Sequence, residues 1–94
     1  MNFKNFEAIV LNENDNVGTS IKNLKKNSKI NLKQDNLFIN FVIKEDINLC
    51  HKFALVKIKK GENILKYGEV IGVAKNCIKK GMHVHIHNIK SLRG

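Results

Sequence analysis

The chain has 94 residues, with 17 Lys and Arg against 8 Asp and Glu, a formal net charge of +9, and no proline. This length fits one domain spanning residues 1–94 with a single compact core, and it disfavours a core combined with a deep private active-site cleft, so catalysis is expected to need a second chain or a second copy. No segment approaches the ~20 apolar residues of a membrane-spanning helix, and the first residues lack the apolar run of a signal peptide, so we expect a cytoplasmic protein.

The excess positive charge comes almost entirely from lysines that are spread along the chain, and Asn and Ile are also abundant. These three residue types rise together in genomes rich in A and T, so the charge is weak evidence for nucleic-acid binding, which we do not expect. It favours an anionic substrate or an acidic partner surface. Cys50 and Cys77 form no CxxC pair, which excludes a typical zinc site and predicts buried free thiols in a reducing compartment.

The elements follow one another as short strands and turns. A first strand over residues 6–11 leads into an Asn- and Asp-rich loop, and Val17, Ile21 and Leu24 then recur at helical spacing, which predicts a helical turn over 17–24. Short strands broken by Gly and Asn turns predict an all-β, barrel-like or clip-like fold with at most one or two helical turns. The further strands are expected at residues 29–32, 37–43 (after a turn at 34–36), 53–58, 63–65, 70–74 and 83–89.

One turn pattern occurs three times, at residues 24–30, 58–64 and 78–84. In each copy an apolar residue precedes two lysines, then Asn or Gly, then the start of a strand. Asn27, Gly61 and Gly81 are expected to adopt positive φ, because glycine does so without steric cost and Asn is the next best residue. The lysine pairs are then exposed turn residues.

The segment 83–88 (HVHIHN) carries the strongest chemical signal. Side chains alternate along a strand, so His83, His85 and His87 are expected on one face, with neighbours ~6.6–6.8 Å apart. Two imidazoles at that spacing can share a divalent metal ion, while the outer pair is too far apart. We favour His85 and His87, followed by Asn88, over His83. The pattern alone fits an edge strand with a solvated polar face even better.

Three other groups can carry chemistry. His51 and Lys52 can bind a carboxylate or act as an acid/base pair, or they form a surface pair where a strand begins. Tyr67, beside Gly68, can donate to a substrate oxygen or pack as a core ring. Asp15 with its neighbour Asn16 can supply a ligand or base, or cap the helical turn that follows.

Four segments together resemble one family: residues 15–19 (DNVGT), 50–55 (CHKFAL), 64–72 (ILKYGEVIG) and 83–88 (HVHIHN). They resemble the small domain of altronate dehydratases, a member of the SAF group of β-clip domains. Galactarate dehydratase and the α subunit of sulfolactate sulfo-lyase are relatives. The chain departs from the family pattern at Cys50, where Gly is usual, and at Gly18, where Ala is usual.

The resemblance implies the small subunit of a sugar-acid dehydratase that eliminates water from an anionic 2-hydroxy acid with the help of iron(II) or manganese(II). A large catalytic subunit would supply the base and hold most of the metal, and a homo-oligomer is a further possible assembly. His85 and His87 would be metal ligands or acid/base groups. The catalytic set implied is His51, His85 and His87, and the substrate-binding set is Lys52, Lys66, Tyr67, Asn88, Asp15 and Asn16.

Three other functions remain open. The first is the small subunit of a sulfolactate sulfo-lyase, in which sulfite leaves instead of water. The second is a non-catalytic carbohydrate-binding or assembly module, which would not need the HVHIHN ending. An RNA-binding β-domain ranks last, since no aromatic ladder for stacking bases is present.

Overall fold

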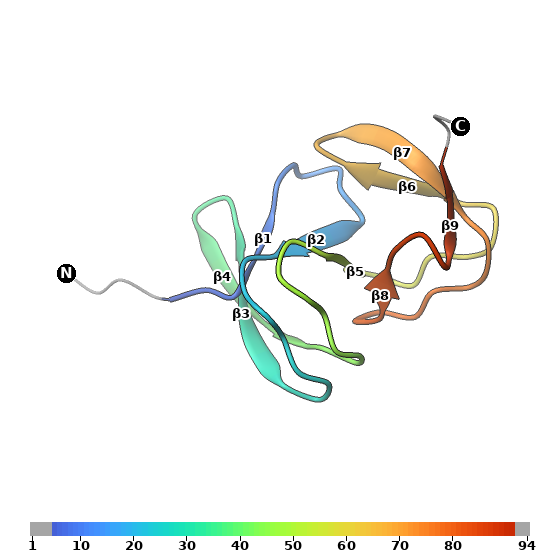
Figure 1. Cartoon of the computed structure of the whole chain (residues 1–94). Helices are drawn as coiled ribbons and strands as arrows, with labels where there is room; N and C mark the ends of the chain where they lie inside the picture. The colour runs from blue at the N-terminus through green and yellow to red at the C-terminus, as the bar shows by residue number, and fades with distance from the viewer. Residues whose placement is uncertain (1–4, 92–94) are drawn as a thin grey trace.

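The computed structural model describes residues 5–91, and this part folds into short β-strands joined by turns (Figure 1). The predicted all-β fold is confirmed, since the described residues form no helix. It follows that they include no helix able to cross a membrane. The strands are β1 (Ala8–Val10), β2 (Val17–Ser20), β3 (Lys29–Gln34), β4 (Leu37–Val42), β5 (Lys52–Ala54), β6 (Asn63–Lys66), β7 (Glu69–Ala74), β8 (His83–Val84) and β9 (Ile89–Ser91).

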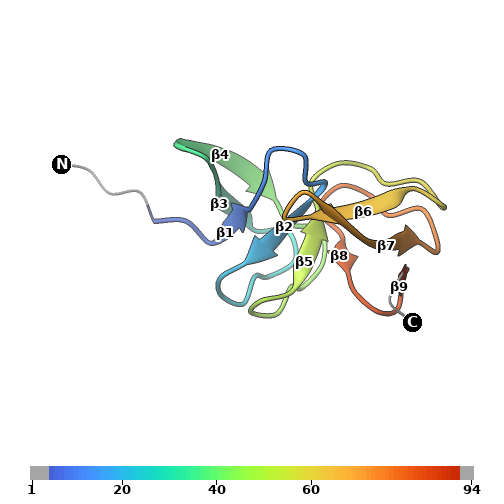
Figure 2. The same cartoon turned by 90° about the horizontal axis from the view of Figure 1, so that it is seen from above.

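These strands form two sheets. The larger has the order β4-β3-β1-β2-β5-β8, and the smaller has the order β6-β7-β9. β1 runs parallel to β3, and every other neighbouring pair is antiparallel. The hairpins β3–β4 and β6–β7 lie at opposite ends of the molecule with β2 and β5 between them, as two perpendicular views show (Figure 1, Figure 2).

The repeated turn is the organising unit of the fold. Asn27, Gly61 and Gly81 have φ of 69°, 87° and 86°, which confirms the expected positive φ at all three. A fourth copy at residues 47–51 escaped the sequence pattern because it lacks the lysine pair, and there Cys50 has φ 70°. The lysine pairs of the other copies are exposed, as expected.

The four turns join in two reciprocal pairs. In each pair the positive-φ residue of one turn donates its N–H to a carbonyl that precedes the other turn, and the apolar residues that begin the turns bridge each other. Residues 20–51 (the first half) and residues 54–82 (the second half) therefore repeat one arrangement, with one hairpin in each. The N–H donations are Asn27 to Ile43, Cys50 to Ser20, Gly61 to Ala74 and Gly81 to Ala54; the bridges are Leu24 to Ile47 and Ile58 to Ile78.

Two apolar clusters form the core, one centred on each half. Phe41 and Phe53 meet in the first cluster, with ring centroids 5.3 Å apart, and Ile64 is fully buried in the second. A β-carbon at Gly18 would lie 2.7 Å from Cζ of Phe53. The packing of Phe53 therefore requires glycine at this position.

Three predicted elements differ from the structure. The strand expected at 53–58 ends at Ala54, where its pairing with β2 stops, and the chain bends at residues 55 and 56. Residues 17–20 form β2 rather than a helical turn, because this segment pairs with β1 and β5 on both sides, and Ile21 is 43% exposed where a helix face would bury it. The strand expected at 83–89 stops after Val84, and residues 85–88 turn before β9 begins. The prediction of buried thiols is wrong as well, because Cys50 and Cys77 are both exposed and free.

Candidate functional site

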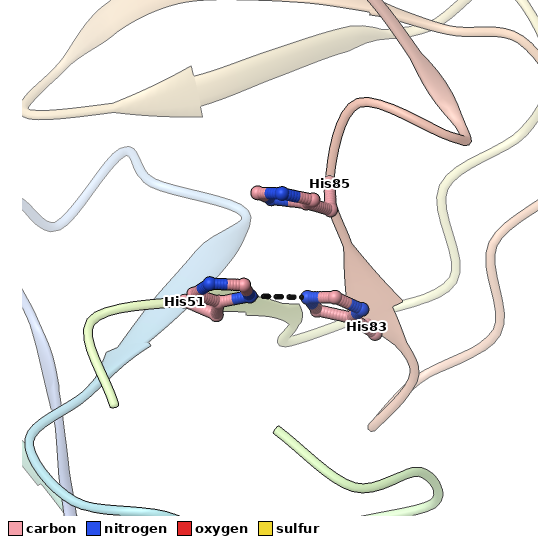
Figure 3. Close-up of side chains that lie close together, drawn as sticks. All are labelled: His51, His83 and His85. Atoms are coloured by element: carbon pink, nitrogen blue, oxygen red, sulfur yellow. Dashed lines mark hydrogen bonds between the residues drawn. The ribbon is translucent and has the colours of Figure 1, made fainter. Parts of the chain in front are cut away.

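Three histidines meet at the junction of β5 and β8. His51 directly precedes β5, His83 begins β8, and His85 follows it. Nδ1 of His51 lies 2.9 Å from Nε2 of His83, and one nitrogen from each of the three rings lies within 4.8 Å of the others (Figure 3). The rings are nearly parallel, with centroids 4.4–5.2 Å apart. We call these three residues the histidine cluster.

Asn88 shapes the turn that completes the histidine cluster. Its side chain is only 9% exposed, donates to the carbonyl of His83 at 2.6 Å and accepts from the N–H of His85 at 2.9 Å. The carbonyl of His85 accepts in turn from the N–H of Asn88 at 3.0 Å. These bonds bend the chain after β8 and bring His85 back beside His51. The predicted contact of Asn88 with substrate stays a prediction.

Glu45 supports the cluster from the segment after β4. Its carboxylate accepts the backbone N–H of His83 at 2.8 Å, which fixes the first residue of β8. The sequence gives no sign of this role, because Glu45 lies in a loop far from His83 along the chain and matches no recognisable motif.

The electrostatics of the cluster favour the neutral form of His83 and His85. Partial burial lowers the pKa of His83, and the charges of His51, His85 and His87 lower it further, against the opposing effect of Glu45. The pKa of His85 is lowered by burial first and then by the neighbouring positive charges of the site. Neutral imidazole is the form that binds a metal ion.

His87 stands beside the cluster and is not one of the three converging rings. It is exposed, and its ring is tilted by 39° to that of His83 at a centroid distance of 5.3 Å. The predicted pairing of His85 with His87 rested on a strand that continues through both, and the turn at 85–88 removes that alternation. His85 converges instead with His51 and His83, while the ligand roles themselves stay predictions.

Lys52 adds positive charge next to the cluster, and Lys66 lies near Lys52. Burial lowers the pKa of Lys52, and the nearby charge of Lys66 lowers it further. Lys52 in turn contributes to the lowered pKa of His85. The two ammonium groups suit a carboxylate. Tyr67 is 65% exposed, with the Nζ of Lys66 5.8 Å from its ring centroid.

Asp15 and Asn16 attach the β6–β7 hairpin to the loop before β2. The buried carboxylate of Asp15 accepts the N–H of Tyr67 at 3.0 Å and that of Gly68 at 2.8 Å. The side chain of Asn16 makes two 2.8 Å bonds with the backbone of β6, one as donor and one as acceptor. No helix follows for Asp15 to cap, and the predicted contacts with substrate stay predictions.

The donor set defines what the cluster can bind. Three neutral imidazoles suit iron(II), zinc and similar ions, whereas manganese(II) prefers oxygen ligands, so the residues fit iron better than manganese. His51, His83 and His85 would hold the ion, and three protein ligands would leave positions open for substrate oxygens.

Comparison with known proteins supports the resemblance seen in the sequence. The chain is 38% identical to the altronate dehydratase of Escherichia coli (strain K12) over 77 residues, which cover 82% of this chain and 15% of that protein. For the altronate dehydratase of Bacillus subtilis (strain 168), the identity is 34% over 83 residues, covering 88% of this chain and 16% of the relative.

A smaller relative is similar over most of its own length. The α subunit of (2R)-sulfolactate sulfo-lyase from Paracoccus pantotrophus is 41% identical over 59 residues, 63% of this chain and 88% of that subunit. The family model described as the altronate/galactarate dehydratase SAF domain matches residues 6–92. With a match over nearly its whole length, the chain belongs to the altronate/galactarate dehydratase SAF domain family.

Proposed function

We propose that this chain is the small subunit of a sugar-acid dehydratase and that it binds a divalent metal ion, iron(II) in preference, through His51, His83 and His85. The convergence of the three imidazoles within 4.8 Å carries the proposal. The names of the relatives support lyase chemistry. We propose that a large subunit supplies the rest of the enzyme, because this chain spans only 15% and 16% of the two altronate dehydratases.

The reaction is β-elimination from a 2-hydroxy acid. A base removes the proton on the carbon beside the carboxylate, and the hydroxyl on the next carbon leaves as water. When bound, a divalent cation supplies Lewis acidity that stabilises the negative charge of the enediolate. Lys52 and Lys66 hold the substrate carboxylate through their ammonium groups. The ring of His87 gives a proton to the leaving hydroxyl, and the large subunit supplies the base.

The test is reconstitution with a large subunit. The chain is co-expressed with a protein from the same genome that is similar to the remaining part of altronate dehydratase, and the complex is assayed with altronate, galactarate and sulfolactate in the presence of iron(II) or manganese(II). We expect one substrate to be turned over, with the greater rate in iron(II). No complex, or a complex without lyase activity on any of the three, contradicts the proposal.

Sulfite elimination is the second candidate, since the residues similar to this chain cover 88% of the sulfo-lyase α subunit, which is itself a small chain. The sulfolactate arm of the same assay decides between the two leaving groups. Unchanged turnover in a variant with both His85→Ala and His87→Ala would instead favour a non-catalytic assembly module. The cytoplasmic location stays a prediction.

A further inference from the structure

The open edge of β4 is the starting point. β4 is the outermost strand of the larger sheet, and among the described residues no strand pairs with its outer side. The N–H of Ile43 bonds back toward β3 at Ser28, whereas the N–H of Lys44 points outward to the carbonyl of Gly81 at 2.9 Å. Because N–H groups alternate along a strand, those of Asn40 and Val42 point outward as well.

The internal repeat shows what is missing at this edge. β4 in the first half corresponds to β7 in the second, and β7 carries β9 antiparallel on its outer side. The corresponding residues Lys44 and Lys75 both donate outward at 2.9 Å, to Gly81 and to Asn88. After Asn88 the chain continues as β9 along β7. After Gly81 it leaves for β8, so the place beside β4 that matches β9 is not filled by the described chain.

Two hollows adjoin this edge and share Phe41 and Lys80. One, of about 300 Å³, is lined by Asn40, Phe41, Val42, Lys44 and Lys80. The other, of about 270 Å³, lies over the face of the β3–β4 hairpin and includes Ile39 and Val56, which are 39% and 54% exposed. An added strand would therefore find apolar contacts for its side chains as well as hydrogen-bond partners for its backbone.

We propose that the edge of β4 takes up an extended segment of the large subunit as an added antiparallel strand, with apolar side chains toward Ile39 and an acidic side chain near Lys44 and Lys80. This inference rests on the proposed partnership with a large subunit. Charge favours the large subunit over a second copy of this chain as the source of the added strand. The chain carries a net charge of +9, so a second copy would bring another basic surface against Lys44 and Lys80, whereas an acidic segment would be attracted to them. Strand addition of this kind supplies affinity through main-chain hydrogen bonds and specificity through side-chain pockets.

Amide hydrogen exchange of the wild-type chain, alone and with the large subunit, is the first test. We expect the amides of Asn40 and Val42 to become protected in the complex. A complex that leaves both amides unprotected overturns the inference. Protection that instead grows with the concentration of the isolated chain identifies a second copy as the occupant and overturns it too.

Matched variants give the second test. Asn40→Pro removes an outward N–H at an edge, where proline is tolerated, and is expected to weaken binding of the large subunit about tenfold or more, whereas Asn40→Thr keeps the N–H and binds like the wild type. Lys80→Glu is expected to weaken binding about fivefold, and Lys60→Glu, at the other turn of the second half and outside both hollows, is not. Equal affinities throughout contradict the inference.

The outcomes separate this inference from the proposed function. A complex that uses β4 but lacks lyase activity with every substrate leaves the docking surface standing and removes the proposed reaction. A large subunit that does not bind the wild-type chain at all removes both. If Asn40→Pro fails to fold, the exchange pattern of the wild-type complex decides alone.

Discussion

At the scale of single residues, Cys50 occupies a backbone conformation that suits glycine. Its φ of 70° lies in the left-handed region, which costs a residue with a β-carbon about 1–2 kcal/mol. Glycine removes this cost, but it also makes the unfolded chain more flexible, which offsets part of the gain in stability. We therefore expect Cys50→Gly to raise the free energy of unfolding by about 0.5–1 kcal/mol. Urea denaturation measures it.

Cys77→Gly is the matched control for this prediction. Cys77 is equally exposed but is not among the residues with positive φ, so the same substitution there is expected to lower the stability. Two variants that change stability in the same direction would show that the turn conformation is not the cause.

The histidine cluster makes a second prediction at this scale. Removing a residue that only orients a metal ligand typically weakens metal binding about tenfold to a hundredfold. Removing a ligand itself is expected to cost more, so His85→Ala should bind iron(II) at least about a hundredfold more weakly than the wild type. His87→Ala, outside the three converging rings, should bind within a few-fold of the wild type. Anaerobic calorimetry measures the iron(II) affinity of both variants. An equal loss of affinity in the two variants would show that His87 is a ligand as well.

At the scale of elements, the repeated turn offers two glycines that differ only in surroundings. A β-carbon at Gly61 meets nothing within 4 Å, whereas one at Gly81 would lie 2.7 Å from the carbonyl oxygen of Val42. Both have strongly positive φ, of 87° and 86°. Gly61→Ala is therefore expected to cost about 1–2 kcal/mol, and Gly81→Ala clearly more, since backbone must also move. Equal melting temperatures of the two variants would contradict this.

The anchoring of the β6–β7 hairpin gives the next prediction. Removing the buried carboxylate of Asp15 leaves the N–H groups of Tyr67 and Gly68 without their acceptor, so Asp15→Ala is expected to cost about 1.5–3 kcal/mol. Denaturation followed by the fluorescence of Tyr67, the only tyrosine in a chain without tryptophan, measures the loss. Glu13→Ala, at an exposed position of the same loop, should change little.

The sequence predicts the elements better than it predicts the site. Turn chemistry is local, so positive φ at Asn27, Gly61 and Gly81 follows from residue type and pattern, while that at Cys50 does not, since cysteine carries no such preference. The ending of β8 depends on Asn88 folding back onto the carbonyl of His83, which alternation cannot anticipate. The approach of His51 to His83 needs the pairing of β5 with β8, a contact between distant segments.

At the scale of the whole molecule, the histidines set the response to pH. The pKa values of His83 and His85 in the folded chain lie below 6.5, so between those values and about pH 6.5 the unfolded chain binds more protons. The free energy of unfolding should therefore fall as the pH falls below about 6.5 and be level, from this source, above it.

Denaturation at several pH values between about 5 and 8 checks this response. A variant with both His83→Ala and His85→Ala should show a flatter curve below about pH 6.5 than the wild type. A wild-type stability that rises on acidification through this range would show that the cluster is stabilised in its charged form.

The position of the cluster relative to the internal repeat has a consequence for the lifetime of the protein. His51 closes the first half, while His83 and His85 follow the second, so an ion held by all three fastens the two halves together. Under the proposed function, free metal at a hundredfold excess over the Kd adds about 2.7 kcal/mol to the stability of the fold. Cells starved of the metal would then degrade this chain faster, because proteases act on the unfolded fraction. The supply of the ion would set the abundance of the subunit as well as its activity.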